Sequence, residues 1–230
     1  MEKLELPMEN NNYLMINPDY FEDIKVELED FLYGEDGLNS RDFVRKILFN
    51  QEIKTNNAVE GINNDLLIIE NVIKNNLMIG NDKKRREIIN LYNGYKYIFT
   101  NNIMDKEHLL ELYKILSDGL LSSSDMARMG EYYREDKVYI LRKGRIDMEL
   151  AEGIDYSLID RYMDIYFAYV NDNSDKTMTD EFIKSQIMHF YFVYIHPYFD
   201  VNGRSSRTMA MWYLLNNKAY PYIIYNRAMS

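Results

Sequence analysis

The chain contains no cysteine among its 230 residues, and this absence excludes whole classes of chemistry. Disulfide frameworks, structural metal sites built on thiolates and cysteine nucleophiles are all ruled out, and the composition suits a reducing compartment. Glycine and proline are also scarce, with 10 and 4 residues respectively. We therefore expect neither a long flexible linker nor a low-complexity tract.

Positive charge is in short supply as well. Lys and Arg number 27 against 37 Asp and Glu, which gives a net charge of −10. Nonspecific nucleic-acid binding needs a basic surface, so nucleic acid is not an expected partner. No apolar run approaches the roughly 20 residues that span a bilayer, so no membrane is expected either. The first residues do not form a signal peptide, which predicts a location in the cytoplasm or, after delivery, in another cell's cytosol.

Hydrophobic residues make up 47% of the chain, enough for a sizeable globular core. They recur at helical spacing along most of its length. These stripes fall within residues 21–31, 44–48, 69–73, 88–99, 109–116 and 158–169. The sequence therefore predicts an all-α protein, with an N-terminal helical segment at residues 1–45 and one main domain at residues 46–230.

The densest group of chemically capable residues runs from His196 to Arg207. It is preceded by apolar residues at helical spacing, namely Ile183, Ile187, Phe190 and Tyr194. Pro197 disfavours the helical conformation in the residue before it, so this helix is expected to end at His196. A second helix is predicted from about Asn202, with Thr208, Met211, Trp212 and Leu215 on one stripe.

The residue types in the intervening loop suit the binding of a polyphosphate. His196 would lie at the C-terminal end of a helix, where the helix dipole favours the charged form of the imidazole. Backbone N–H groups at the start of the second helix would point toward an anion. Asp200 is the only carboxylate in the loop, and carboxylates hold Mg²⁺ together with substrate phosphates. Arg204 and Arg207, one turn apart and on one side of that helix, can fork onto phosphate oxygens.

Residues 196–207 resemble the signature of the Fic family, His-x-Phe-x-(Asp/Glu)-(Gly/Ala)-Asn-Gly-Arg-x-x-Arg. The resemblance implies a Fic-type helical bundle with a short β-hairpin flap. It also implies transfer of AMP from ATP to a Ser, Thr or Tyr hydroxyl of a protein target, with the enzyme itself as a further acceptor. His196 would be the general base and Asp200 the ligand of Mg²⁺. The phosphate-binding residues would be Asp200, Val201, Asn202, Gly203, Arg204, Ser205, Ser206 and Arg207.

Two positions differ from that signature. Tyr198 stands in place of Phe, which keeps the ring and adds a hydroxyl that needs a partner. Val201 stands in place of Gly or Ala, and a β-branched residue accommodates positive φ poorly. If the loop needs positive φ there, the phosphate site is altered; if it does not, the change is mild. Gly203 is retained, which argues against the phosphotransferase branch of the family.

The resemblance extends to two elements upstream of the loop. Residues 130–134, followed by Val138, Tyr139, Ile140 and Leu141, are similar to the family's flap, expected around residues 132–146. An edge strand of this kind can dock a target by main-chain pairing, and residues 138–141 would contact the nucleotide. Residues 56–61 are similar to the family's inhibitory motif, expected around residues 55–61, although Asn56 replaces Ser or Thr. Glu60 would pair with Arg207 where the γ-phosphate should lie.

Other functions stay open on the sequence alone. The same loop could use another donor, such as UTP or a phosphocholine carrier, or remove AMP with Glu60 holding a water. A non-catalytic nucleotide-binding module and the toxin half of an inhibitor pair are further alternatives. The target protein, the modified residue type and assembly into a homo-oligomer are not specified.

Overall fold

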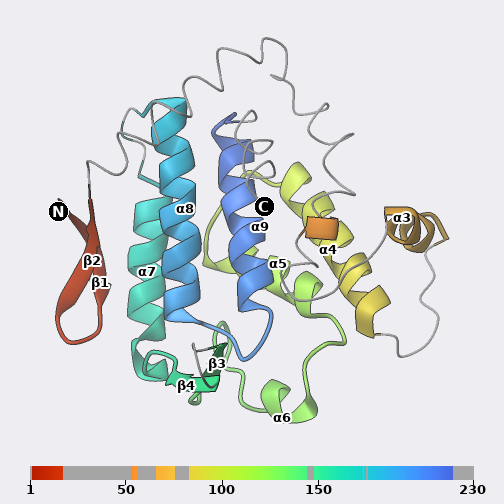
Figure 1. Ribbon diagram of the computed structural model, residues 1–230, viewed down its shortest axis with the longest axis horizontal. Coiled ribbons are helices and arrows are strands. Elements are labelled where there is room, and N and C mark those ends of the chain that lie inside the picture. The colour runs from red at the N-terminus through yellow and green to blue at the C-terminus, as the bar shows by residue number, and fades with distance from the viewer. Residues whose placement is uncertain are drawn as a thin grey trace.

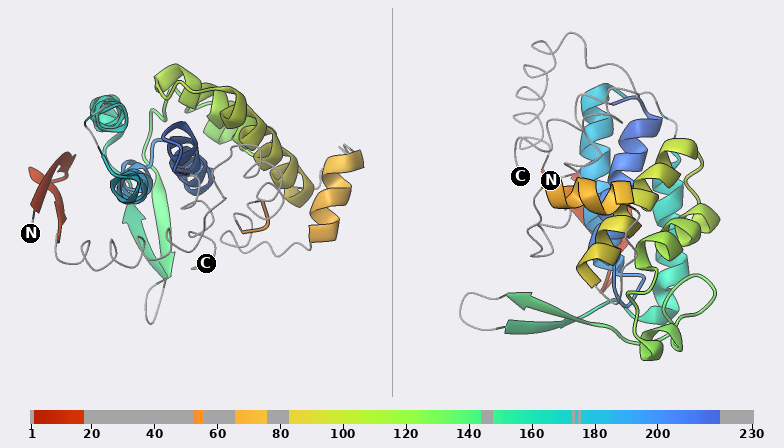
Figure 2. Two further views of the ribbon diagram at one scale, coloured as in Figure 1. Left: turned by 90° about the horizontal axis from the view of Figure 1, so that it is seen from above. Right: turned by 90° about the vertical axis from the view of Figure 1, so that its right-hand side faces the viewer.

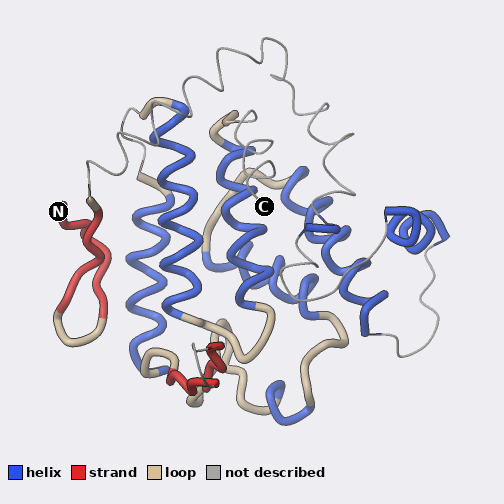
Figure 3. The backbone as a smooth tube through the Cα atoms, in the orientation of Figure 1, coloured by secondary structure: helices blue, strands red, loops and turns tan. Residues whose placement is uncertain are grey.

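The computed structural model describes residues 2–17, 53–55, 66–75, 83–143, 148–172, 174 and 176–219. Helices make up most of this part, and its strands form two separate hairpins (Figure 3). The predicted helical fold with a short hairpin is therefore confirmed. The helices expected around residues 21–31 and 44–48, and the whole of residues 56–61 with Glu60, lie outside the described residues.

The helical body consists of α3 to α9. The first four helices are α3 (Leu66–Asn75), α4 (Lys83–Thr100), α5 (Lys106–Ser117) and the one-turn α6 (Ser123–Met126). A 3₁₀ turn (Tyr156–Leu158) then leads into α7 (Ile159–Val170), α8 (Met178–Ile195) and α9 (Asn202–Asn216). α8 packs between α7 and α9, while α4 and α5 pack against each other and cover α9 (Figures 1 and 2). α4 begins at a basic cluster, residues 83–86, of which the first three are exposed and Arg86 is half-buried.

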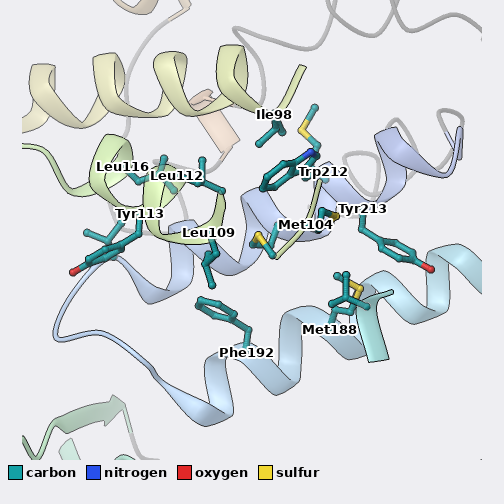
Figure 4. Close-up of a cluster of buried hydrophobic side chains, with 14 of the residues drawn as sticks. Ile98, Met104, Leu109, Leu112, Tyr113, Leu116, Met188, Phe192, Trp212 and Tyr213 are labelled. Carbon is teal, nitrogen blue, oxygen red and sulfur yellow. The ribbon is translucent and has the colours of Figure 1, made fainter. Parts of the chain in front are cut away.

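The core lies where α5, α8 and α9 meet. Trp212 of α9 is fully buried, and its indole Nε1 donates to the carbonyl of Asn101 over 2.7 Å. Leucines of α5 approach Phe192 of α8 in the same cluster (Figure 4). All four residues of the predicted stripe on α9 are buried. On α8 the prediction is wrong for Phe190, whose side chain is 50% exposed, because the helix buries Tyr191 and Phe192 instead.

An N-terminal hairpin, which the sequence analysis did not predict, precedes the helical body. It pairs β1 (Glu2–Met8) with β2 (Asn12–Ile16) in antiparallel register. Asn10 and Asn11 both have positive φ, the requirement of the tight turns that join hairpin strands, and asparagine is favoured there. The hydroxyl of Tyr191 donates to the carbonyl of Pro7 over 2.7 Å, which fastens this hairpin to α8.

The second hairpin pairs β3 (Tyr139–Lys143) with β4 (Met148–Glu152). A short hairpin is present as predicted, but its strands lie within residues 139–152 and not within 132–146. It extends away from the helices at the end of the bundle where α8 turns into α9 (Figures 1 and 2). Among the described residues its sheet has only these two strands, so each strand has one unpaired edge. Among the same residues, no helix combines the length and the apolar character needed to cross a membrane.

Candidate active site

His196 occupies the C-terminal cap of α8 and points its ring back at the helix. Its backbone N–H donates to the carbonyl of Phe192 over 3.0 Å, and its φ of 52° turns the chain away from the helix axis ahead of Pro197. The ring Nδ1 lies 3.3 Å from the carbonyl oxygen of Val193. A carbonyl can only accept, so in the neutral ring this contact places the proton on Nδ1 and leaves Nε2 as a proton acceptor.

The charge state of His196 differs from the expectation based on the helix dipole. Burial, and to a smaller extent the positive charge of Arg134, lower the pKa of the imidazole to about 4. The Val193 carbonyl and the carboxylate of Asp200 act in the opposite direction but are outweighed. The prediction that the charged form is favoured is therefore wrong. Removal of the ring from water dominates, and His196 is neutral at physiological pH.

The loop that follows is held in shape by Asn202. Its side-chain oxygen accepts from the N–H of Tyr198 over 3.0 Å, and its side-chain nitrogen donates to the Tyr198 carbonyl over 2.8 Å. Asn202 is 3% exposed. The side chain expected to cradle phosphate thus closes the loop internally.

Tyr198 fills the space below the loop. Its ring is fully buried and stacks on Tyr113 of α5, with centroids 3.5 Å apart and planes 5° apart. Tyr133 and Phe192 lie beside it at centroid distances of 6.1 and 6.3 Å. The aromatic ring therefore performs the packing role expected of the Phe that it replaces. Its added hydroxyl is buried without a hydrogen-bond partner in the described part of the chain.

Val201 adopts the left-handed conformation, with φ of 68° and ψ of 8°. Such a conformation costs a β-branched residue about 1–3 kcal/mol. Burial of the side chain, which is 3% exposed, helps to hold this conformation. So does a hydrogen bond of 2.6 Å from the backbone N–H of Val201 to Oδ1 of Asp200. The loop does need positive φ at this position, and it keeps that geometry with valine present.

The start of α9 carries backbone N–H groups of the kind that bind anions. No side chain caps its first N–H groups, and Ser205 is the first residue whose N–H bonds back to the carbonyl of Val201. The amides of Asn202, Gly203 and Arg204 therefore lack partners within the helix. Ser205 and Ser206 are fully buried, and Ser206 donates to the Gly203 carbonyl. The hydroxyl of Ser205, in contrast, is buried without a hydrogen-bond partner among the described residues.

The two arginines, one turn apart on α9, lie in different surroundings. Arg204 is 5% exposed, and one of its terminal nitrogens lies 3.4 Å from Oε1 of Glu87 on α4. Its other terminal nitrogen is 3.9 Å from Oδ1 of Asp200. Arg207 is only half-buried. Burial, and then the nearby charge of Arg207, lower the pKa of His189 on α8, so Arg207 lies at the junction of α8 and α9.

Asp200 has the surroundings expected of a magnesium ligand. Its side chain is 46% exposed, and its contacts with Val201 and Arg204 both involve Oδ1. Among the described residues there is no group of three acidic or histidine side chains that could hold a metal ion alone. A magnesium ion at Asp200 would therefore need oxygen ligands from a bound phosphate, which is how Mg²⁺ is commonly held. The residues present fit a metal that arrives with a nucleotide.

The flap presents its first strand beside this loop (Figure 1). Val138 is buried at its base, whereas Tyr139 is 56% exposed. Tyr139, Ile140 and Leu141 pair with β4 through Glu152, Ala151 and Leu150.

Two charged residues at the site were not singled out from the sequence. Arg134 was considered only as part of the flap pattern, although it bonds to the carbonyl of His196. Glu87, the partner of Arg204, was not considered at all. The sequence does contain a pattern that could have indicated Glu87. Glu87 and Asn90 are polar, yet they share one face of α4 with the buried residues Leu91 and Gly94.

Comparison with known proteins agrees with this geometry. Residues 103–214, a little less than half of the chain, match the model of the Fic/DOC family. The fold is similar to that of a Fic family protein from Desulfovibrio desulfuricans, with a TM-score of 0.62 and 19% identity over 91% of this chain and 62% of that one. It is also similar to a fragment of Fic-1 from C. elegans, with a TM-score of 0.63 and 15% identity over 87% and 59%.

The similarity to these structures shows the fold of the protein. The chain has the Fic fold, and its residues 103–214 carry the Fic/DOC match. It spans less than two thirds of the length of each of these two structures. No curated protein matches it.

Proposed function

We propose that this protein is a protein adenylyltransferase, which transfers AMP from ATP to a Ser, Thr or Tyr hydroxyl of a protein target and of itself. The observation that carries the proposal is the pairing of a neutral imidazole with an open helix start. His196 offers Nε2 as a proton acceptor, and the first amides of α9 offer an anion site one short loop away. The Fic/DOC match covers both elements.

The reaction follows from what these groups can do. The target hydroxyl gives its proton to Nε2 of His196 while its oxygen forms a bond to the α-phosphorus. The bond between that phosphorus and the oxygen bridging to the β-phosphate breaks, and pyrophosphate leaves. The α9 amides hold the phosphates in line for this displacement. Magnesium, when bound through Asp200, would neutralise charge on the phosphates and on the leaving pyrophosphate.

The target is proposed to dock on the exposed edge of the flap. An extended segment can pair with such an edge through its main chain and present a hydroxyl in register. The flap lies at the same end of the molecule as the α8–α9 loop (Figure 1). The loop keeps its left-handed turn with Val201 present, so this substitution is no argument against phosphate binding there.

Glu60 is proposed to restrain the reaction by pairing with Arg207. Replacement of Glu60 by glycine should then raise self-modification, because the place of the γ-phosphate becomes available. The intact mass of the purified protein, measured after incubation with Mg²⁺ and ATP, should increase by one AMP unit in the Glu60→Gly variant and less in the unmodified chain. Glu70→Gly, an exposed acidic position on α3 that pairs with Lys74, serves as the control.

The same experiment distinguishes the alternatives. A mass gain with UTP and none with ATP would mean a different donor, and loss of AMP from a previously modified protein would mean the reverse reaction. Nucleotide binding without any mass gain, even in the Glu60→Gly variant, would mean a non-catalytic module. An unchanged level of self-modification in that variant would leave Glu60 without an inhibitory role.

The buried position of His196 predicts an unusual pH profile. With a pKa of about 4, the imidazole stays neutral as the pH falls through 6.5, where an ordinary histidine would gain a proton and lose its function as a base. The value of kcat/KM for ATP, which reports the free enzyme, should therefore hold down to about pH 5 and fall below it.

Circular dichroism at each pH is the control for this profile. In the unfolded chain His196 binds a proton near pH 6.5, whereas in the folded protein it does so only near pH 4. Between these values the unfolded state binds more protons. The free energy of unfolding therefore decreases as the pH is lowered from 6.5 to 4. Half-maximal kcat/KM near pH 6.5, with the fold intact, would contradict the assignment of a buried His196 as the base.

A further inference from the structure

A fully buried arginine lies between the flap and the candidate catalytic loop. Arg134 follows the short segment after α6 and precedes β3, and it is 1% exposed. Its backbone N–H donates to the carbonyl of Pro197 over 3.0 Å, which joins the two segments through their main chains. A buried guanidinium is costly unless its donors are satisfied, so the partners of Arg134 indicate why it is there.

Each nitrogen of the guanidinium donates to a backbone carbonyl of a different segment. Nε donates to His196 over 2.9 Å. Nη1 donates over 2.6 Å to Asp136, which lies just before β3, and Nη2 donates over 2.6 Å to Ile154, which lies just after β4. The guanidinium of Arg134 therefore joins the backbone of His196, the candidate base, to the backbone at both ends of the flap hairpin. Arginine suits this task because its donors form a rigid fork, whereas the ammonium of lysine is a single point.

The hairpin is closed tightly around this group at Gly153. A methyl group at that position would lie 2.6 Å from Cγ1 of Val138 and 3.1 Å from Nη2 of Arg134. The N–H of Gly153 donates to the carbonyl of Val138 over 2.9 Å, which seals the base of the hairpin. The base of the flap therefore has room for Arg134 and for no added side chain.

We infer that Arg134 is a positioning residue that fixes the flap at a set distance from His196, so that a hydroxyl held on the flap edge meets Nε2 of the base. This inference rests on the proposed adenylyl transfer. A displacement of about 1 Å in such a geometry can cost on the order of 10²-fold in rate. The proposed phosphate-binding amides belong to α9, and the guanidinium of Arg134 bonds to no residue of that helix, so binding of the phosphates should depend little on Arg134.

Three variants test this, each placed in the Glu60→Gly background with self-modification as the readout. Arg134→Met removes the donors, Arg134→Lys keeps a charge without the fork, and Gly153→Ala crowds the guanidinium by one methyl. The matched control is Lys184→Met, because Lys184 is 3% exposed and donates to the carbonyls of Val170 and Asp172 at the end of α7. All four variants alter a buried site bounded by backbone carbonyls, and only the first three lie at the flap.

We expect both Arg134 variants to lower the rate at saturating ATP by about 10²-fold and to change the half-saturating ATP concentration by less than about threefold. Gly153→Ala should act in the same direction. Hydrogen exchange at β3 and β4 should accelerate in these variants, whereas Lys184→Met should leave both flap exchange and the rate unchanged. A lysine at position 134 that sustains the full rate would overturn the inference, as would an equal loss of rate in Lys184→Met.

Failure of this inference can be told apart from failure of the proposed function. If no variant transfers AMP, including Glu60→Gly alone, the adenylyltransferase proposal fails, and flap exchange still tests the contact between Arg134 and the flap. Unchanged flap exchange in Arg134→Met would overturn the positioning role whatever the activity. If Arg134→Met does not fold, Gly153→Ala carries the same test with every hydrogen-bonding group present.

Discussion

Replacement of His196 by alanine should lower AMP transfer by about 10²–10⁴-fold, the usual contribution of a general base. The structural reason is that the ring is already prepared for this role. Its Nδ1 proton is engaged by the Val193 carbonyl, and burial keeps Nε2 unprotonated. Without the ring, the attacking hydroxyl must lose its proton to water, which is a weaker base than imidazole.

The affinity for ATP should survive this substitution, because the phosphates are held by amides of α9. The check is a pair of measurements on one preparation: the rate of labelled AMP incorporation and the ATP dissociation constant. His108→Ala is the control, since His108 pairs with Asp105 at the start of α5 and belongs to no part of the candidate site. An unchanged rate in His196→Ala would remove His196 from the mechanism.

Much of the loop could be predicted because its local rules are strict. Pro197 prevents the helix from continuing, so α8 ends where the sequence indicates. The apolar spacing beyond Asn202 fixes the start and the buried stripe of α9. The hairpin at residues 139–152 was found through resemblance, since its alternation of polar and apolar residues is weak.

The environment of each side chain could not be predicted, since it depends on distant segments. His196 loses its charge through burial by surrounding elements, which outweighs the local effect of the helix end. Arg204 meets Glu87, more than a hundred residues earlier in the chain. The sequence shows that these residues are charged, and only the packing of α4 on α9 shows that the two are partners.

The N-terminal hairpin was missed although its signal is present. Asn10 and Asn11 form the kind of pair that tight hairpin turns require, and Leu4, Leu6, Leu14 and Ile16 alternate on either side. Pro7 counts against a central strand but is tolerated at an edge. A prediction based on helical periodicity alone does not detect a hairpin as short as that of β1 and β2.

The pair formed by Glu87 and Arg204 should dominate the stability of the site. Both side chains are 6% exposed, and removal of one partner leaves a buried charge without its counterion. Glu87→Ala should therefore lower the free energy of unfolding by about 3–5 kcal/mol. The nearby carboxylate of Asp200 moderates this loss, because it stays 3.9 Å from the guanidinium. Urea denaturation followed by circular dichroism measures the change.

A double variant separates this structural role from nucleotide binding. Glu87→Leu combined with Arg204→Met replaces both charges with apolar groups, which is often close to neutral, and the two changes should couple by about 0.5–3 kcal/mol. Strictly additive losses would show that the two residues act independently.

The double variant lacks the cation that Arg204 would offer to ATP, and comparison with the Glu87→Leu single variant isolates that effect. A charge-assisted hydrogen bond contributes about 1.5–3 kcal/mol, so loss of a direct phosphate contact should weaken ATP binding by roughly 10- to 100-fold. Isothermal titration with Mg²⁺ and ATP gives the answer. An unchanged dissociation constant would mean that Arg204 serves α4 and the loop alone, and that Arg207 and the α9 amides hold the phosphates without it.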